Sequence, residues 1–276
     1  MKRAVVMTDI SGLGNCSANA NIAVMSVLGV ETCLVPTAVL SAQTGFGDVY
    51  FKGLYRESAD IAESLISHEP QVNAVYIGFL TCAEQYRTAL RLIDAFSPKA
   101  AVLADPICGD GGERFSFVDD EMFINLRRVV GRADIITPNI TELCLLGGGD
   151  YKKLSSLGGN AQISYAESLC RNIMNGRKMT VVVTGLGDDD TAVNITVTDS
   201  GCDVSRSERC GGSMSGTGDI FSSVICAQAA KGESISAACD TAARFISYVM
   251  SREAGNITDR NYGIPYQKYL SMLING

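Results

Sequence analysis

The chain has 276 residues, of which 46% are hydrophobic and 19% charged, with 23 basic and 30 acidic side chains and a net charge of -7. This composition excludes a disordered or collagen-like chain, and no apolar run reaches the roughly 18 residues that a membrane span needs. The acidic balance makes a polyanionic nucleic acid a poor partner, so we expect a soluble globular protein that acts on neither nucleic acid nor membranes.

Strand-like and helix-like patterns alternate from the first residues of the chain. A short apolar run over residues 2–8 predicts a strand, and apolar side chains spaced as on one helix face predict a helix over residues 15–28 that Gly29 ends. The same patterns predict further strands at residues 31–40, 74–80, 100–104, 134–136 and 179–184, with helices around residues 86–93, at 119–130 and at 164–175.

This alternation predicts parallel strands with helices on both faces of the sheet, because a parallel crossover usually takes a helix. Residues 191–197 and the segment after Gly201 predict a β-hairpin, which two helices at about residues 218–231 and 234–250 follow. Since no linker interrupts the pattern, we expect one α/β domain over residues 1–276. Loops are predicted at residues 41–53, 108–117 and 147–161, the first being either a lid or a strand and turn packed on the core.

The chain holds ten cysteines without a CxxC pair and a single histidine, His68. Buried free thiols are typical of a reducing compartment, and residues 1–6 lack the apolar stretch of a signal peptide, so we expect a cytoplasmic protein. A catalytic triad or a multi-histidine metal site would have to be built around His68, and both are discarded.

Gly12 and Gly14 follow the first predicted strand, where a dinucleotide-binding turn would begin. That turn is disfavoured, because Ser17 stands where its third glycine belongs and no acidic residue ends the second strand near Leu40. Asp9 would also place a carboxylate beside the pyrophosphate. The glycines instead fit a tight turn beside a small ligand that Asp9 contacts, or an ordinary connection between strand and helix.

The segment GGSMSGTGD, residues 211–219, leads directly into an apolar helix. Successive unhindered backbone N–H groups at a helix N-terminus form an anion hole for a phosphoryl group, and the helix dipole strengthens it. Asp219 then lies in the first helical turn, either as a residue that stabilises the dipole or as a general base toward a substrate hydroxyl.

Other carboxylates follow predicted strands: Asp105 ends one strand, and Glu142 lies in the helix that opens after another. Parallel strands point the same way, so Asp9, Asp105, Glu142 and Asp219 are expected to gather at one edge of the sheet. Together with a glycine anion hole they indicate Mg²⁺ between protein and phosphates, bound partly through water. Alternatively, Asn139 and Glu142 form an ordinary capping box at a helix start.

The segments DP at residues 105–106, TPNITE at 137–142 and GTGD at 216–219, in this order, resemble the ribokinase-like superfamily of ATP-dependent small-molecule kinases. Within it, SAQTGFG at residues 41–47 and DPICGD at 105–110 look most like the pyridoxal kinase branch. The resemblance spans nearly the whole chain. It implies a three-layer α/β/α sandwich with a mostly parallel central sheet and small β-hairpin and loop insertions.

The resemblance implies transfer of the γ-phosphoryl group of ATP to the 5'-hydroxyl of pyridoxal, pyridoxamine or pyridoxine. Asp219 would accept the hydroxyl proton, and Gly216, Thr217 and Gly218 would hold the transferring phosphoryl group. A homodimer is also implied, and K⁺ is a further candidate cation. The other implied contacts are Asp9, Thr44, Gly45 and Asp219 with the acceptor, Asp105 and Glu142 with Mg²⁺, and Asp105, Thr137, Asn139, Glu142, Thr184, Arg206, Arg209, Gly216 and Gly218 with ATP.

Two positions depart from the pyridoxal kinase pattern: Asp9 stands where Ser is frequent, and Thr184 where one branch has Lys. A carboxylate at position 9 would favour a protonated ring nitrogen or the amine of pyridoxamine. The alternative is the hydroxymethylpyrimidine kinase branch of thiamine synthesis, whose opening residues 8–12 resemble, but that branch commonly has Cys where this chain has Asp219. A second alternative is a non-catalytic nucleotide-binding or ligand-binding module on the same fold.

Overall fold

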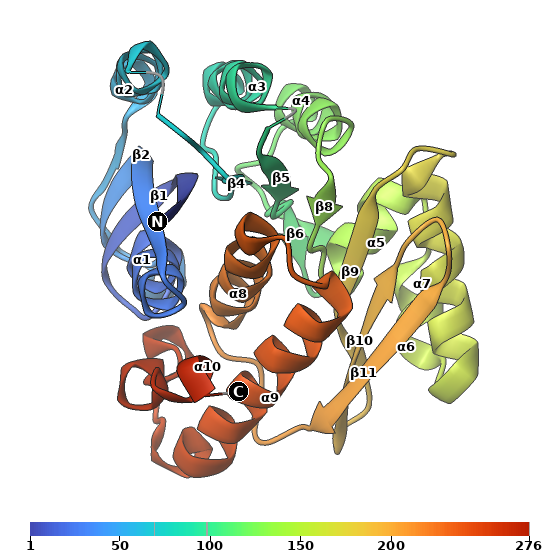
Figure 1. Ribbon diagram of the computed structural model, residues 1–276. Coiled ribbons are helices and arrows are strands. Elements are labelled where there is room, and N and C mark those ends of the chain that lie inside the picture. Colours follow the sequence, from blue (N-terminus) through green and yellow to red (C-terminus); the bar gives the residue numbers. More distant parts are fainter. Residues whose placement is uncertain (69, 98, 276) are drawn as a thin grey trace.

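The computed structural model describes residues 1–68, 70–97 and 99–275 (Figure 1). The described residues form a nine-stranded sheet in the order β11-β10-β9-β8-β5-β4-β1-β2-β3. Neighbouring strands from β9 to β2 pair in parallel, whereas β10, β11 and β3 run antiparallel to their neighbours at the two edges. The strands are β1 (Lys2–Leu13), β2 (Val30–Ala42), β3 (Phe51–Gly53), β4 (Ala74–Ile77), β5 (Ala101–Ala104), β8 (Ile135–Ile136), β9 (Thr180–Gly187), β10 (Thr191–Val197) and β11 (Cys202–Glu208).

Helices cover both faces of this sheet (Figure 1). Along β1, Val5 and Met7 belong to one hydrophobic core and Ala4 and Val6 to the other, because successive side chains of a strand point to opposite faces. All four are fully buried, as expected for a parallel strand covered on both sides. The predicted three-layer α/β/α sandwich is therefore confirmed. The first core packs against α2 (Tyr55–Ser67), α3 (Ala83–Phe96), α4 (Asp120–Val130), α5 (Ile140–Gly147), α6 (Tyr151–Ser156) and α7 (Gly159–Met174), and the second against α1 (Ser17–Val27), α8 (Thr217–Lys231), α9 (Ile235–Glu253) and α10 (Met272–Asn275).

The first strand is longer than the sequence predicts. Residues 9–13, which follow the predicted strand and were expected to belong to a turn, continue β1. The register of β1 against β2 shifts between Thr8 and Ile10, and pairing then resumes with Ser11 opposite Leu40. Asp9 therefore lies at a local irregularity of the kind that re-aims a side chain without ending the strand.

Residues 41–53 contain a strand and a turn at the edge of the sheet, and most of their side chains are exposed rather than packed on the core. β2 continues to Ala42, the short 3₁₀ helix η1 (Thr44–Phe46) follows, and β3 returns antiparallel to β2 with Phe51 opposite Leu40. The turn is thereby anchored at the edge of the central sheet.

The predicted loops at residues 108–117 and 147–161 are only partly loops. The first contains a two-stranded sheet of β6 (Gly109–Asp110) and β7 (Glu113–Arg114). The second contains α6 and the start of α7, which begins before the predicted residue 164. These short elements are rich in glycine and polar residues, so the sequence shows no clear strand or helix pattern there. Packing in the folded chain, such as the burial of Leu154 in α6, stabilises them.

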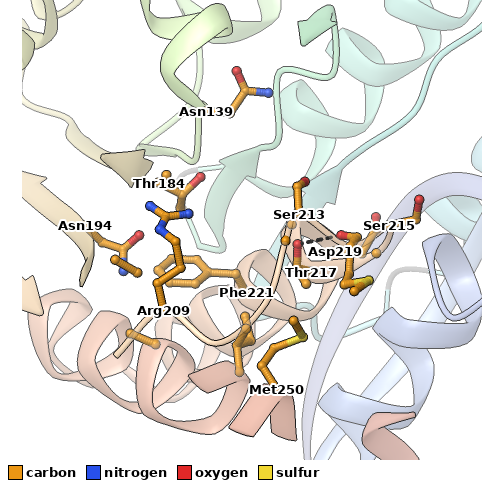
Figure 2. Close-up of a pocket in the computed structure, with 18 of the residues that line it drawn as sticks. Asn139, Thr184, Asn194, Arg209, Ser213, Ser215, Thr217, Asp219, Phe221 and Met250 are labelled. Atoms are coloured by element: carbon orange, nitrogen blue, oxygen red, sulfur yellow. Dashed lines mark hydrogen bonds between the residues drawn. The ribbon is translucent and has the colours of Figure 1, made fainter. Parts of the chain in front are cut away.

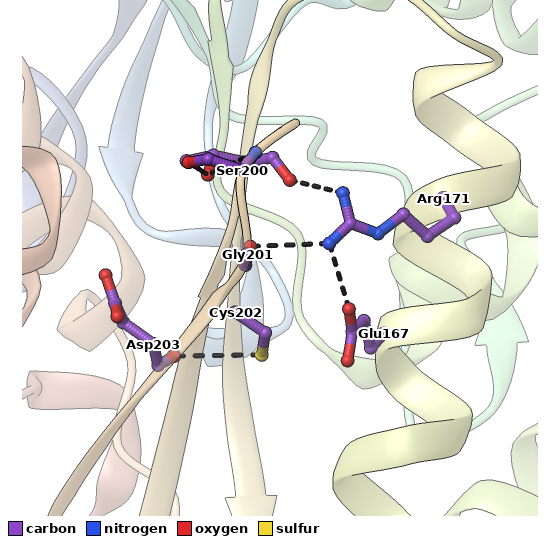
Figure 3. Close-up of polar contacts among 7 residues, drawn as sticks. Glu167, Arg171, Ser200, Gly201, Cys202 and Asp203 are labelled. Carbon is purple, nitrogen blue, oxygen red and sulfur yellow. Dashed lines mark hydrogen bonds and ion pairs between the residues drawn. The ribbon is translucent and has the colours of Figure 1, made fainter.

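The β10–β11 hairpin, which the sequence predicts, is tied to α7 (Figure 3). Arg171 of α7 donates hydrogen bonds to the carbonyl oxygens of Thr198 and Gly201 at the hairpin turn. The same guanidinium lies 2.9 Å from Oε1 of Glu167 on α7. These contacts fix the tip of the hairpin on the helix layer.

The sequence predicts that the chain has no membrane span and that its cysteines are free thiols. No helix in the described ranges is both long and apolar enough to cross a lipid bilayer. The ten cysteines are free thiols, six of them buried, and behave as small hydrophobic residues rather than cross-links.

Candidate active site

A cavity of about 500 Å³ opens at the carboxyl ends of the central parallel strands. Asp105 follows β5, Thr137 follows β8 and Thr184 lies in β9, while residues 211–219 reach the cavity on their way into α8. This is the edge at which α/β proteins bind ligands, and the volume suits a small molecule.

The cavity is elongated, as Figure 2 shows. Asp219 and Ser215 lie at one end, and Asn194 and Arg209 lie at the other. The residues predicted for the site that line this cavity are Asp105, Thr137, Asn139, Glu142, Thr184, Arg209, Gly216, Thr217, Gly218 and Asp219.

The glycine-rich loop ends at Gly216, which occupies the N-cap position of α8. Its φ of 79° lies in the left-handed region, and a Cβ there would come within 2.0 Å of the carbonyl oxygen of Asn15. Only glycine fits this close approach. The first N–H groups of α8 have no intrahelical acceptor, so they can donate hydrogen bonds to an anion in the cavity. The positive end of the helix dipole further stabilises a negative charge there.

Asp219 is half-buried in the first turn of α8. Burial raises the pKa of Asp219 to about 7, the backbone N–H of Ser17 opposes this rise, and the charges of Asp105 and Asp9 add to it. Ser17 itself has a φ of 54°, a conformation that side-chain-bearing residues seldom adopt and that is concentrated at functional sites. The result is a carboxyl group that can exchange a proton near neutral pH.

Asp9 belongs to β1 and does not line the cavity. It is 3% exposed, and its Oδ2 accepts a 2.8 Å hydrogen bond from the hydroxyl of Ser11. Burial raises the pKa of Asp9, against hydrogen bonds from Ser17 and Ser11 that favour the charged form. Thr44 and Gly45 are exposed in η1 and do not line the cavity either.

Asp105 accepts hydrogen bonds from two buried side chains. The hydroxyl of Tyr76 donates to Oδ2 at 3.1 Å, and that of Thr137 donates to Oδ1 at 3.2 Å. Ser222 of α8 in turn donates to Thr137 at 2.9 Å. Burial raises the pKa of Asp105 to about 6, even though these hydroxyls stabilise the carboxylate.

Asn139 and Glu142 form the capping box that the sequence offers as an alternative. Oδ1 of Asn139 accepts from the backbone N–H of Thr141 and of Glu142 at 2.8 and 2.9 Å, while Oε2 of Glu142 accepts from the N–H of Asn139 at 2.9 Å. The other oxygen, Oε1, accepts from the N–H of Cys108 at 3.2 Å. Glu142 therefore has a clear structural role, and any ligand role is additional to it.

Burial raises the pKa of Glu142 well above its ordinary value, and repulsion from Asp105 adds to this effect. Asp105 and Glu142 repel each other when both are ionised. A cation bound beside them would offset this repulsion, so the pair suits a cation site. The described residues contain no group of three or more His, Cys, Asp or Glu side chains that could enclose a metal. The carboxyl groups of Asp105 and Glu142 fit Mg²⁺ by their chemistry, because that cation takes one or two protein carboxylates and keeps several waters.

At the other end of the cavity, Arg209 is committed to the backbone. Its guanidinium donates to the carbonyl oxygens of Asp188 and Leu186 at 2.6 and 2.9 Å and so braces the connection between β9 and β10. Arg206, predicted with it, does not line the cavity. Arg206 is exposed on β11, whereas the next residue, Ser207, lines the cavity.

Helix α9 forms one wall of the cavity, which the sequence did not predict. Ala243, Ile246, Ser247 and Met250 line the cavity at the i, i+3, i+4, i+7 spacing of one helix face, opposite Phe221 of α8. The signal was the apolar periodicity of this helix, which predicts a core face without showing where the core ends and a cavity begins.

Comparison with known proteins identifies relatives over most of the chain. A family model described as phosphomethylpyrimidine kinase matches residues 14–263. A pyridoxine/pyridoxal/pyridoxamine kinase from Bordetella avium is 24% identical over 248 residues, which cover 84% of this chain and 79% of the relative.

Solved structures match the whole fold. A candidate phosphomethylpyrimidine kinase from Bacteroides thetaiotaomicron aligns with a TM-score of 0.91 at 29% identity, covering 99% of this chain and 94% of that one. An orthorhombic form of that protein, with pyridoxal, aligns at 0.89 and 28% identity, covering 99% and 96%. The pyridoxal kinase of Lactobacillus plantarum shares the fold, with a TM-score of 0.88 at 19% identity over 100% of this chain and 97% of that one.

Proposed function

The chain belongs to the phosphomethylpyrimidine kinase family, and we propose that it phosphorylates the 5'-hydroxyl of pyridoxal, pyridoxamine or pyridoxine with ATP as the donor. The observation that carries this proposal is the position of Asp219. A carboxyl with a pKa raised to about 7 directly follows a glycine-rich anion loop at a helix N-terminus. The vitamin B6 kinase among the relatives, and the pyridoxal in a structure 28% identical to this chain, support the choice of acceptor.

Asp219 acts as the general base. The acceptor hydroxyl gives its proton to Asp219 while its oxygen forms a bond to the γ-phosphorus and the bond from that phosphorus to the β–γ bridging oxygen breaks, releasing ADP. An aspartate with an ordinary pKa of 3.8 would be a weak base toward an alcohol, whereas a pKa of about 7 matches neutral conditions.

The backbone N–H groups of Gly216, Thr217 and Gly218 hold the transferring phosphoryl group. Its charge spreads over the equatorial oxygens in the transition state, and fixed donors at a helix N-terminus stabilise that charge without having to reorganise. The rest of ATP occupies the cavity from this end toward Thr184 and Arg209. There Phe221 and Met250 offer apolar surface of the kind that a nucleotide base covers.

Asp105 and Glu142 would hold Mg²⁺, partly through water. Thr137 and Asn139 line the same cavity. The cation, when bound, supplies positive charge between the phosphates. The chain's own residues orient these carboxylates: Tyr76 and Thr137 fix the Asp105 carboxylate, and the capping box fixes Glu142.

Asp9, Thr44 and Gly45, which do not line the cavity, are proposed to contact the acceptor. The supporting observation is electrostatic, since the charge of Asp9 raises the pKa of Asp219. As further proposals, residues 1–276 form one kinase domain, and this domain acts as a homodimer. It works in the cytoplasm, a proposal that its ten free thiols support.

The second candidate function is phosphorylation of hydroxymethylpyrimidine. The description of the matching family model favours it, and it needs the same nucleotide site. The presence of Asp219 disfavours this second function, because the hydroxymethylpyrimidine kinase branch commonly has Cys at the corresponding position.

The test is ADP release with Mg·ATP against pyridoxal, pyridoxamine, pyridoxine and hydroxymethylpyrimidine, with ribose as an outgroup and with and without K⁺. The proposal predicts the largest kcat/KM for a B6 form. A larger value for hydroxymethylpyrimidine would assign the second function instead. Failure of every acceptor would leave only a nucleotide-binding or ligand-binding module.

A further inference from the structure

One short segment near the C-terminal end of the chain contacts three separate loops of the site. This strap, residues 259–263, contains the 3₁₀ helix η3 (Arg260–Tyr262). The backbone N–H of Asn15, after β1, donates to the carbonyl oxygen of Tyr262 at 3.1 Å, and that of Ser215, in the glycine-rich loop, donates to the carbonyl oxygen of Arg260 at 3.2 Å. The third loop, after β2, reaches the strap through the side chain of Gln43.

Gln43 uses both ends of its amide. Oε1 accepts a 2.8 Å hydrogen bond from the N–H of Gly45, which caps η1. Nε2 donates to Oδ1 and to the carbonyl oxygen of Asn261 at 3.1 and 3.2 Å, and it also lies 3.4 Å from the hydroxyl of Ser215. One half-buried side chain thus joins the segment that begins at Thr44, the strap and the glycine-rich loop.

The fit around these contacts is tight. A Cβ at Gly45 would lie 2.3 Å from Oδ1 of Asn261, and a Cβ at Gly263 would lie 2.7 Å from the carbonyl oxygen of Ser215. The rings of Phe46 and Tyr262 meet edge to face with their centroids 5.0 Å apart, so η1 touches the strap at a second point. Movement of η1 relative to the glycine-rich loop must therefore break polar and aromatic contacts together.

We propose that Gln43 is a positioning residue that holds the acceptor-side segment Thr44–Gly45 in register with the phosphoryl-binding loop, with Asn261 as its partner. The inference rests on the proposed function, because it takes Thr44 and Gly45 as acceptor contacts. An amide suits this position because it accepts at one end and donates at the other, whereas a carboxylate of the same length can only accept.

Gln43→Ala and Gln43→Glu test the proposal against Gln71→Ala, which changes an exposed glutamine near the amino end of β4. Loss of one or two hydrogen bonds predicts an acceptor KM raised about tenfold in both Gln43 variants, with the KM for ATP within about twofold of the unchanged protein. Gln43→Glu must behave like Gln43→Ala, since it keeps the contact to Gly45 but cannot donate to Asn261. Unchanged acceptor KM, or equal increases for acceptor and ATP, would overturn the proposal.

Hydrogen exchange of the protein without substrates gives a readout that does not depend on the reaction. Gln43→Ala is expected to speed exchange in residues 43–47 and 259–263 and to leave the central strands unchanged. Combining it with Asn261→Ala is expected to add little, because both changes remove the same contact. If no acceptor is phosphorylated by the unchanged protein, the proposed function fails while the exchange result still decides the coupling. Unchanged exchange in both segments would refute the role of Gln43.

Discussion

The hydroxyl of Tyr76 donates a 3.1 Å hydrogen bond to Oδ2 of Asp105, and both side chains are buried. Tyr76 comes from the middle of the sheet and Asp105 from the end of the neighbouring strand, so a core residue supports a residue of the cavity. The bond stabilises the carboxylate and therefore lowers the pKa of Asp105 relative to what burial alone would give.

Tyr76→Phe removes this donor without changing the ring. The pKa of Asp105 is then expected to rise further above about 6, so that less of it is ionised at neutral pH. The Mg²⁺ concentration needed for half-maximal turnover is expected to rise several-fold near neutral pH and to recover at about pH 8.5. Titrations with Mg²⁺ at the two pH values measure this, with Tyr86→Phe as the control for a buried tyrosine. An equal Mg²⁺ requirement at both pH values would contradict the role given to the hydrogen bond.

The alternation of strands and helices could be predicted from the sequence, because buried parallel strands and amphipathic helices have distinct periods. The extension of β1 past Asp9 could not be predicted, because it depends on the pairing of Ser11 with Leu40 of the neighbouring strand β2. The helix α6 was missed for a similar reason: its buried Leu154 has meaning only once α5 and α7 are in place.

As with the fold, one part of the candidate site could be predicted from the sequence and another part could not. The glycine-rich loop and the carboxylates at strand ends were predictable, because their chemistry is local and parallel strands bring them to one edge. The α9 wall, the link from Gln43 to Asn261 and the hydroxyl of Tyr76 behind Asp105 were not. Each joins residues far apart in the chain by a contact that no motif records.

Gly216 and Gly218 provide a matched pair in one loop. Gly216→Ala places a Cβ within 2.0 Å of the carbonyl oxygen of Asn15 at a φ of 79°, so a loss of about 2 kcal/mol in the free energy of unfolding is expected. A Cβ at Gly218 meets nothing within 4 Å, and alanine favours the helix by up to about 1 kcal/mol. Urea unfolding of both variants checks this. Equal stability of the two would show that the close approach to Asn15 is not a constraint.

Asp219→Asn tests the raised pKa of Asp219 through stability. In the folded chain Asp219 binds its proton up to about pH 7, whereas in the unfolded chain it loses the proton near its ordinary value of 3.8. The folded state therefore binds more protons in this interval, and Asp219 makes folding less favourable as the pH rises through it.

An uncharged amide avoids this loss. Asp219→Asn is expected to have a higher Tm than the unchanged protein at about pH 8, and the difference is expected to vanish toward about pH 3, below both pKa values, where Asp219 is protonated in both states. Thermal unfolding across this range measures the difference, with exposed Asp60→Asn as the control. A lower Tm for Asp219→Asn at about pH 8 would contradict the assigned pKa.

The central claim is that Asp219 removes the proton of a vitamin B6 hydroxyl as ATP phosphorylates it. The most direct measurement is the rate at which pyridoxal phosphate forms, followed by mass spectrometry, for the unchanged protein and for Asp219→Asn, with ATP binding measured by calorimetry on both. We predict that product forms with the unchanged protein, that its rate rises with pH through about 7, and that Asp219→Asn lowers it about 10²-fold or more while ATP still binds. Product formation by Asp219→Asn within about twofold of the unchanged rate, or no phosphorylated product from either protein, would contradict the account.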